Sequence, residues 1–261
     1  MVLERYFDAN GQKMLLPDGY HSYRREIGED GNPAWIAYYG LDDEPVINTK
    51  AKYHRVERTY LDSKHFTSEA WFDTEGNPMT TGDTYCRIER EFDEYGNTIC
   101  ERTYDENRKK IACEAGYDEL QQEFNDKNWA IQIEYFLNSK PVLLENGYAA
   151  IEREYDETGN ITLEKYFDEK NNLILCKKGY AMVHREYDSD KRIICEKFFG
   201  TDGNPIELAD GAVCYRYTYN EAGEKSAPKK FDRDNHEIPE ETPEPTSNPD
   251  DAVGNPLYHT A

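Results

Sequence analysis

The 261-residue chain carries a net charge of -22, and 21 tyrosines, 10 phenylalanines and 3 tryptophans make it rich in aromatic rings. The acidic excess argues against binding of nucleic acid and docking on anionic lipid, because both need clustered lysine and arginine. No apolar run approaches the roughly 20 residues that span a bilayer, and so many rings argue against disorder throughout.

Three series of side chains recur along the chain at steps of 31 to 33 residues, which marks an internal repeat. The first series is aromatic throughout: Phe7, Tyr39, Phe72, Tyr104, Phe136, Phe167, Phe199 and Phe231. The second series is Ile27, Tyr60, Phe92, Phe124, Tyr155, Tyr187 and Tyr219, and the third is Tyr23, Val56, Ile88, Leu120, Ile151, Val183 and Tyr215. The sequence therefore predicts about seven units of 32 residues.

The residue pattern of each unit predicts two strands and a shorter third strand, joined by tight turns. In the clearest copy, Ile151, Arg153 and Tyr155 alternate with two glutamates, which is the period of a half-buried strand. The turn Asp-x-x-Gly-Asn at 156–160 leads into the return strand, and a second Asp-rich turn follows. A single hairpin is marginal in water, whereas stacked neighbours bury a common face. We predict an all-β, elongated, solenoid-like array of β-hairpins over residues 1–238.

Residues 239–261 differ from the array in composition. They are acidic and rich in proline, so we predict a disordered tail or linker. The first residues resemble the middle of a unit and carry no signal peptide. We expect a cell-surface or envelope-associated location if the chain is a fragment of a larger bacterial protein, and a cytoplasmic one if it is complete.

The six cysteines fall on the repeat lattice. Cys100 and Cys195 share one site three units apart, and Cys113 and Cys176 share another two units apart. Equivalent sites in separate units are too distant for a disulfide. There is no CxxC pair and no histidine spacing typical of zinc. We predict that the cysteines act as small buried hydrophobes. This implies either a reducing compartment or an organism indifferent to disulfides.

The sequence predicts no enzyme, no cofactor and no metal. Its histidines are scattered, it has no phosphate loop, and glutamates are too abundant to single out a catalytic pair. The acidic turns offer oxygen ligands suited to calcium, but turn chemistry explains the same residues without a metal.

A second line of rings lies one residue before the first series. Neighbouring residues of a strand point to opposite faces. If the first series is the core, these rings form a partly exposed ladder beside glutamates, which suits sugars or quaternary ammonium groups; the alternative is packing against the next unit. The candidate ligand-binding residues are Tyr6, Tyr38, Trp71, Tyr135, Tyr166 and Phe198.

Arginine recurs on the same strands, two residues after the third series. We expect its side chain to interlock the units by stacking on rings and pairing with acidic residues. The row is Arg25, Arg58, Arg90, Arg153 and Arg185.

The run Tyr155-Asp156-Glu157-Thr158-Gly159-Asn160-Ile161-Thr162 resembles the core of the YD (RHS-type) repeat, and residues 92–98 nearly match it. The longer unit, from Gly-Tyr to Gly-Asn-Pro, is similar to tandem arrays of gut Firmicutes. The resemblance spans roughly residues 1–235 and implies an accessory region of bacterial surface or cell-envelope-associated proteins, with ligand-binding or spacing duties.

Taken together, these patterns predict a non-catalytic repeat module that binds glycan or cell-wall polymer through its ring ladder. The alternative is a structural scaffold, spacer or protein-interaction repeat attached to a larger protein. Neither hypothesis includes nucleic acid or membrane insertion.

Overall fold

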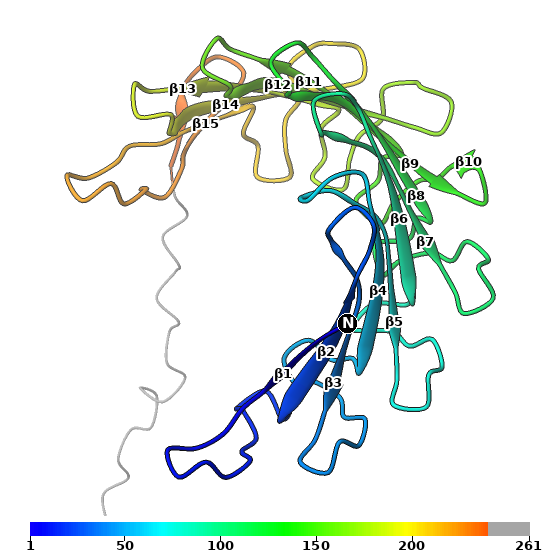
Figure 1. The fold of residues 1–261 in the computed structure, drawn as a ribbon. Helices are drawn as coiled ribbons and strands as arrows, with labels where there is room; N and C mark the ends of the chain where they lie inside the picture. The colour runs from blue at the N-terminus through cyan, green and yellow to red at the C-terminus, as the bar shows by residue number, and fades with distance from the viewer. Residues whose placement is uncertain (240–261) are drawn as a thin grey trace, which may run out of the picture.

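The computed structural model describes residues 1–239, and over that range the chain is entirely β, as predicted. Seventeen strands pair antiparallel in a single unclosed sheet (Figure 1). No helix in this range is long and apolar enough to cross a membrane. Most of the predicted tail, from residue 240 onward, lies outside the described residues.

The sheet follows the order of the chain. Each strand pairs with the one before it and the one after it, except that β11 pairs with β9 and the short β10 pairs only with the end of β9. The first nine strands are β1 (Val2–Arg5), β2 (Ser22–Ile27), β3 (Pro33–Tyr39), β4 (Arg55–Tyr60), β5 (Phe66–Phe72), β6 (Arg87–Phe92), β7 (Thr98–Tyr104), β8 (Glu119–Phe124) and β9 (Ala130–Leu137). The others are β10 (Lys140–Pro141), β11 (Ala150–Tyr155), β12 (Ile161–Phe167), β13 (Met182–Tyr187), β14 (Ile193–Phe199), β15 (Cys214–Arg216), β16 (Lys229–Phe231) and β17 (Glu237–Ile238).

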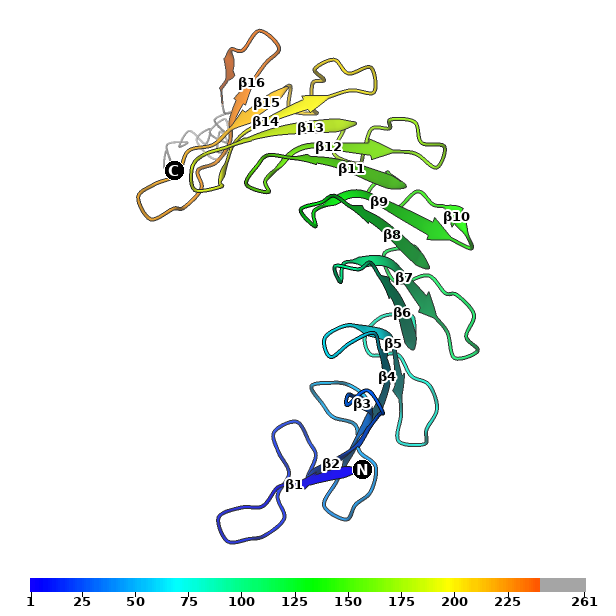
Figure 2. The same ribbon diagram turned by 45° about the horizontal axis from the view of Figure 1, so that its top comes forward.

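The hairpins stack side by side into an open arc, with the ends of the array well separated (Figure 1). A tight turn joins the two strands of each hairpin, and a longer loop leads to the next hairpin. In Figure 2 the tight turns of β8–β9 and β11–β12 point into the arc, whereas the longer loops point outward.

The tight turns form because the aspartate that begins each turn accepts hydrogen bonds from backbone N–H groups later in the same turn. Asp156 Oδ1 accepts from the backbone N–H groups of Thr158 (2.8 Å) and Asn160 (3.0 Å), while Gly159 adopts φ 89°. Asp168 uses the same contacts in the second turn, where backbone and side-chain hydrogen bonds from Asn172 hold the pKa of this carboxyl below its usual range. Both predicted turns, and the turn chemistry that explains them, are confirmed.

Two faces of the sheet differ in what lies over them. The longer loops fold back over one face, here called the covered face, and bury its central side chains. That core contains Val56, Trp71, Ile88, Ile133, Ile151, Tyr166, Val183 and Phe198 from the strands, with Met79, Ile174, Cys176, Tyr180, Ile206 and Leu208 from the loops. The opposite, bare face carries small buried residues such as Ala37, Ala70 and Cys100 beside charged side chains.

The assignment of the core to the first aromatic series is therefore wrong. That series lies on the bare face, where Phe7 is 51% exposed, Phe167 and Phe231 are buried and the others are half-buried. Arginines cover some of these rings, with Arg24 over Tyr39 and Arg216 over Phe231, each 4.0 Å from the ring centre. The loops cover the other face with their side chains, and their backbone bonds to the strand ends, as from Met79 N to Trp71 O (2.9 Å).

Neighbouring hairpins are locked together by tyrosines of the second series. Tyr155, Tyr187 and Tyr219 each donate a hydroxyl hydrogen bond to a backbone carbonyl of the preceding hairpin, at 2.6 to 2.8 Å. This contact repeats with the unit, so it holds successive hairpins in register.

Candidate functional site

The structure buries three of the six candidate rings in the core and leaves the other three half-buried. Trp71, Tyr166 and Phe198 are only 8%, 6% and 3% exposed. Tyr6, Tyr38 and Tyr135 are half-buried. The predicted exposure is wrong for Trp71, Tyr166 and Phe198, because the longer loops fold back over the face on which these rings lie.

Tyrosines from the loops fill the spaces between the candidate rings. Tyr148 packs on Tyr166 with ring centres 4.9 Å apart, and Tyr180 packs between Tyr166 and Phe198, at 5.9 and 4.9 Å. Toward the N-terminus, Tyr20 lies 4.8 Å from Tyr38 in the same way. Of the two interpretations of these rings, packing against neighbouring units therefore describes them better than an exposed ladder, because other rings occupy their faces.

The hydroxyls in this ring stack are held in their neutral form. Burial, followed by the neighbouring Tyr53, raises the pKa of Tyr38 to about 12. Burial likewise raises the pKa of Tyr180 to about 12, and it raises that of Tyr166 further because Tyr166 also donates a hydrogen bond to Glu164. Hydroxyls in this state serve as structural donors and are poor acids.

A row of arginine–glutamate pairs runs beside the ring stack on the covered face. Most pairs join the two strands of one hairpin, such as Arg90–Glu101 and Arg153–Glu164, both at 2.8 Å. Arg185 also reaches Glu164 of the preceding hairpin at 3.7 Å. The predicted interlocking of units is seen at three of these arginines: Arg25 pairs with Glu4 of β1 (3.5 Å), Arg90 lies over the Phe66 ring of the preceding hairpin (4.6 Å), and Arg185 reaches Glu164. The remaining pairs lie within one hairpin. Because both charges are already paired, this row is a poor anion site.

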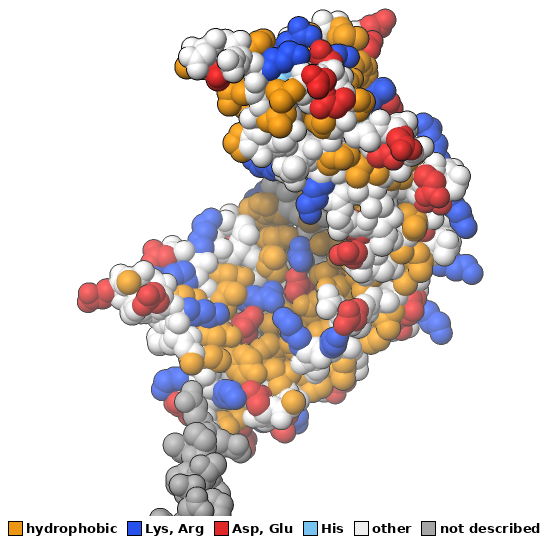
Figure 3. All heavy atoms as spheres, turned by 90° about the horizontal axis from the view of Figure 1, so that it is seen from below, with side chains coloured by type: hydrophobic (Ala, Val, Ile, Leu, Met, Phe, Trp, Pro, Cys, Tyr) orange, Lys and Arg blue, Asp and Glu red, His pale blue; other side chains and the backbone are white. Residues whose placement is uncertain are grey.

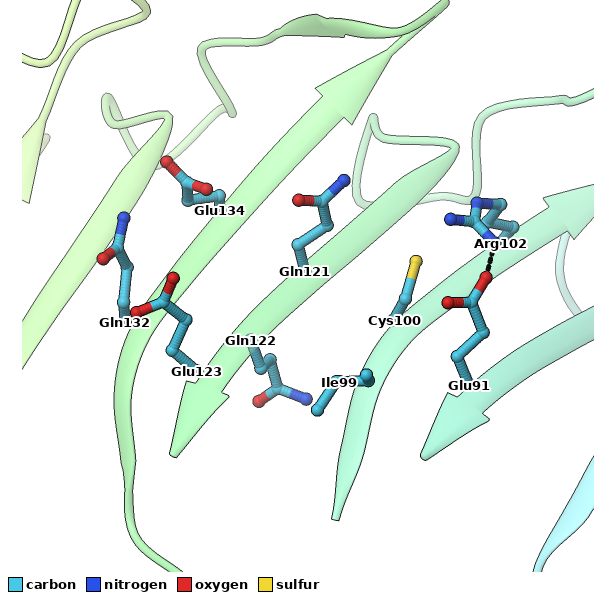
Figure 4. A pocket seen from close by; sticks show the side chains of 9 residues that line it. All are labelled: Glu91, Ile99, Cys100, Arg102, Gln121, Gln122, Glu123, Gln132 and Glu134. Carbon is cyan, nitrogen blue, oxygen red and sulfur yellow. Dashed lines mark hydrogen bonds and ion pairs between the residues drawn. The ribbon is translucent and has the colours of Figure 1, made fainter. Parts of the chain in front are cut away.

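A polar recess lies on the bare face at β6, β7, β8 and β9, with a volume of about 300 Å³ (Figure 4). It combines the carboxylates of Glu123 and Glu134, which have no ion-pair partner within residues 1–239, with the side-chain amides of Gln121 and Gln132 from the same two strands, β8 and β9. Its lining residues are Glu91, Ile99, Cys100, Arg102, Gln121, Gln122, Glu123, Gln132 and Glu134.

The recess exists because one hairpin departs from the charge pattern of its neighbours. On the bare face, the second strand of other hairpins supplies a cation, Arg102, Lys165 or Lys197, that pairs with a glutamate across the hairpin. Glu134 occupies that place in β9, opposite Gln121. This arrangement offers carboxylate and amide oxygens to a cationic or hydroxyl-bearing group.

A row of exposed aliphatic side chains lies on the longer loops, two residues after the start of each short third strand. Leu15, Ile47, Leu143 and Leu175 are 36% to 47% exposed and recur at the repeat step. Thr80, Ala112 and Glu207 take the same place in the other units, so the row forms two separate pairs. Figure 3 shows hydrophobic side chains gathered along the hollow of the arc as well, broken up by both signs of charge.

Within residues 1–239, no group of three or more histidine, cysteine, aspartate or glutamate side chains is arranged to hold a metal ion. The turn aspartates direct their oxygens at backbone N–H groups instead.

Sequence reasoning missed the aliphatic row and the polar recess. The row has a visible signal, since an aliphatic residue recurs in the loop at the repeat step. The recess could be found only by comparing the charge at one lattice position across units, where Glu134 replaces a lysine or arginine.

No family model matches the chain, and no curated protein matches it. Among solved structures, it is similar to the crystal structure of TcdB2-TccC3, at 14% identity and a TM-score of 0.38, covering 84% of this chain and 12% of that one. It is also similar to the Photorhabdus luminescens Tc holotoxin pore, at 12% identity and a TM-score of 0.30, covering 88% of this chain and 13% of that one. The chain thus spans about an eighth of the length of these structures, and likeness at this level does not assign it to a family.

Proposed function

We propose that this chain is a non-catalytic repeat scaffold that binds another protein along the outer rim of its arc. The observation that carries the proposal is the aliphatic row on the longer loops, which point outward in Figure 2. Leu143 and Leu175 are 41% and 43% exposed and occupy equivalent places in successive units. Exposed aliphatic groups in a recurring pattern favour a partner that covers apolar surface.

The arrangement of the rings supports a protein partner over a sugar. A sugar needs an open ring face on which to stack, and the faces of Tyr166 and Phe198 are occupied by Tyr148 and Tyr180. An aliphatic row offers no flat surface for a sugar but packs well against the side chains of a protein.

Site-directed photocrosslinking in the full chain tests the proposal. A photoreactive phenylalanine analogue replaces Leu143 or Leu175 in turn, and Thr80 serves as the matched control because it is exposed at the equivalent loop position. We expect the same protein to be captured from both leucine positions in lysate of the source cells and not from the control. Capture from position 175 should also fall when Leu143→Glu is introduced. Capture that is equal at position 80, or insensitive to Leu143→Glu, contradicts the proposal.

A second candidate is a module that binds glycan or cell-wall polymer. It rests on the half-buried state of Tyr6, Tyr38 and Tyr135, whose outer edges remain accessible. A glycan array is the direct test, with Tyr135→Phe to remove one hydroxyl while the ring stays in place. Binding that weakens in this variant supports the glycan module, whereas an array without signal above background removes it.

A further inference from the structure

Two buried thiols touch across the junction between the last two hairpins. Cys195 in β14 and Cys214 in β15 lie on the bare face with their Sγ atoms 3.4 Å apart. They are 5% and 6% exposed. In the register of the two strands, Cys195 faces Arg216 and Cys214 faces Lys197, so the cysteines are diagonal neighbours.

We propose that Cys195 and Cys214 form a reversible disulfide that fastens the last hairpin, β15–β16, to the rest of the array. Within residues 1–239, these are the two thiols that contact one another; the other four cysteines are buried without a thiol neighbour. The bond would join adjacent units across a junction of three paired residues.

The reaction requires an oxidant, for which we specify a small disulfide such as oxidised glutathione. One cysteine thiol loses its proton and attacks the glutathione disulfide, forming a mixed disulfide and releasing one glutathione. The second cysteine, also deprotonated, then attacks the mixed disulfide and releases the second glutathione. The protein loses two thiol hydrogens and two electrons overall, and both appear in the two reduced glutathione molecules.

The junction offers room for the movement that bond formation needs. A disulfide is about 2.05 Å long, so the sulfurs must approach each other by more than 1 Å. The strand β15 has only three residues, and it pairs with β14 and β16 through three residues each. Hairpins such as β13–β14 pair through six residues on each strand. The last hairpin is therefore the one that can shift toward its neighbour at the lowest cost.

Thiol ionisation sets the speed of this step. Burial, followed by the hydrogen bond with Cys214, raises the pKa of Cys195 to about 12. Since the thiolate is the attacking species, the cross-link should form slowly at neutral pH and faster as the pH rises.

The chain contains a matched control for this pair. Cys100 occupies the same lattice site as Cys195 three units earlier, and its diagonal neighbour in the next strand is Glu119. Cys100 Sγ lies 3.9 Å from a Glu119 carboxylate oxygen, so this thiol has the same surroundings in the sheet but no partner with which to bond.

The test uses the folded full chain incubated with oxidised glutathione, followed by alkylation of free thiols and trypsin digestion. We expect the number of free thiols to fall from six to four, because the bond consumes two. The digest should contain the peptide 193–197 linked to the peptide 198–216, with a mass lower than the sum of the two by two hydrogens. Dithiothreitol should restore both free peptides.

Variants separate the proposed bond from general thiol oxidation. Cys195→Ser and Cys214→Ser should each retain all five remaining thiols, whereas Cys100→Ser should lose two of its five. Circular dichroism establishes that each variant is folded before it is oxidised. Retention of six free thiols by the oxidised wild type, or a cross-link that involves other cysteines, overturns the proposal.

Discussion

The ring stack is continuous through the C-terminal half of the array and broken near its middle. From Tyr117 to Phe198, loop and strand rings alternate, and the strand ring of Tyr215 follows; neighbouring ring centres are 4.9 to 6.3 Å apart. Between Tyr85 and Tyr117, the strand position is occupied by Thr103, whose hydroxyl bonds to the carbonyl of Ile111. The two apolar clusters of the covered face end on either side of this point.

A polar cluster replaces the missing ring at that joint. Asp118 is 1% exposed, and it accepts a hydrogen bond from the backbone N–H of Asn138 (2.8 Å) and lies 3.7 Å from Lys110 Nζ. The equivalent residues in later hairpins are Ala149 and Ala181. The comparison shows that the strand position of this repeat can carry either a stacked ring or a hydrogen-bonded hydroxyl with an ion pair nearby, and we expect the two regions to differ in sensitivity to mutation.

The largest effect is expected within the continuous stack. Tyr166→Ala removes a buried ring from between Tyr148 and Tyr180 and should lower the free energy of unfolding by about 3–5 kcal/mol in urea denaturation. Tyr95→Ala is the control, because Tyr95 is 69% exposed and its loss should change stability by no more than about 0.5 kcal/mol. Equal effects of the two changes would show that the stack does not hold the array together.

A smaller loss is expected at the joint. Asp118→Ala leaves the Asn138 N–H without its acceptor and Lys110 with Glu119 as its remaining partner. We expect a loss of about 1–3 kcal/mol, with hydrogen exchange accelerated first in β7, β8 and β9. A variant as stable as the wild type would mean that an alanine, as in later hairpins, serves equally well there.

Acid should weaken the same joint. Burial raises the pKa of Glu119, but hydrogen bonds from Lys110, Gln121 and Arg102 outweigh it and hold the value at about 2, below the ordinary 4.5. Because the folded-state pKa is depressed, the stabilisation is fully present above about pH 4.5 and is lost as the pH falls toward 2. Stability measured between these values should fall less steeply in Glu119→Gln than in the wild type.

The smallest effect is expected at the polar recess. Glu134→Lys restores the cation found at this position in neighbouring hairpins and places it near Glu123 and Glu152. We expect a gain of about 0.2–1 kcal/mol, the usual range for an exposed pair, seen as a rise in the thermal midpoint that 1 M salt removes. A loss of stability would show that the carboxylate itself is needed for the local structure.

The hairpins, both turns and the repeat step were predictable because each is encoded within one unit. Alternation at Ile151, Arg153 and Tyr155 gives a strand, and the Asp156–Gly159 spacing gives a turn. The identity of the covered face was not predictable in this way. Alternation shows which residues share a face, but it does not show over which face the longer loops fold, and loop side chains such as Met79 pack on the face of Trp71.

The contact between Cys195 and Cys214 was missed for a related reason. A comparison of cysteines at the same position of the repeat relates residues in separate units. Cys195 and Cys214 occupy different positions of the repeat in adjacent units, so that comparison could not pair them. Only the register of β14 against β15 brings them together. The row of exposed aliphatic side chains on the longer loops, in contrast, can be found without the strand register, because it recurs at the repeat step of the sequence.

The pairing of strands in chain order has a consequence for how the protein is made. Every hairpin that leaves the ribosome meets a completed sheet edge formed by residues synthesised just before it. No strand must wait for a distant part of the chain, so the array can assemble vectorially during translation, one unit at a time. Growth of the sheet then keeps pace with synthesis, and the advancing edge is open to wrong pairing in the nascent protein, as is the outer edge of β1.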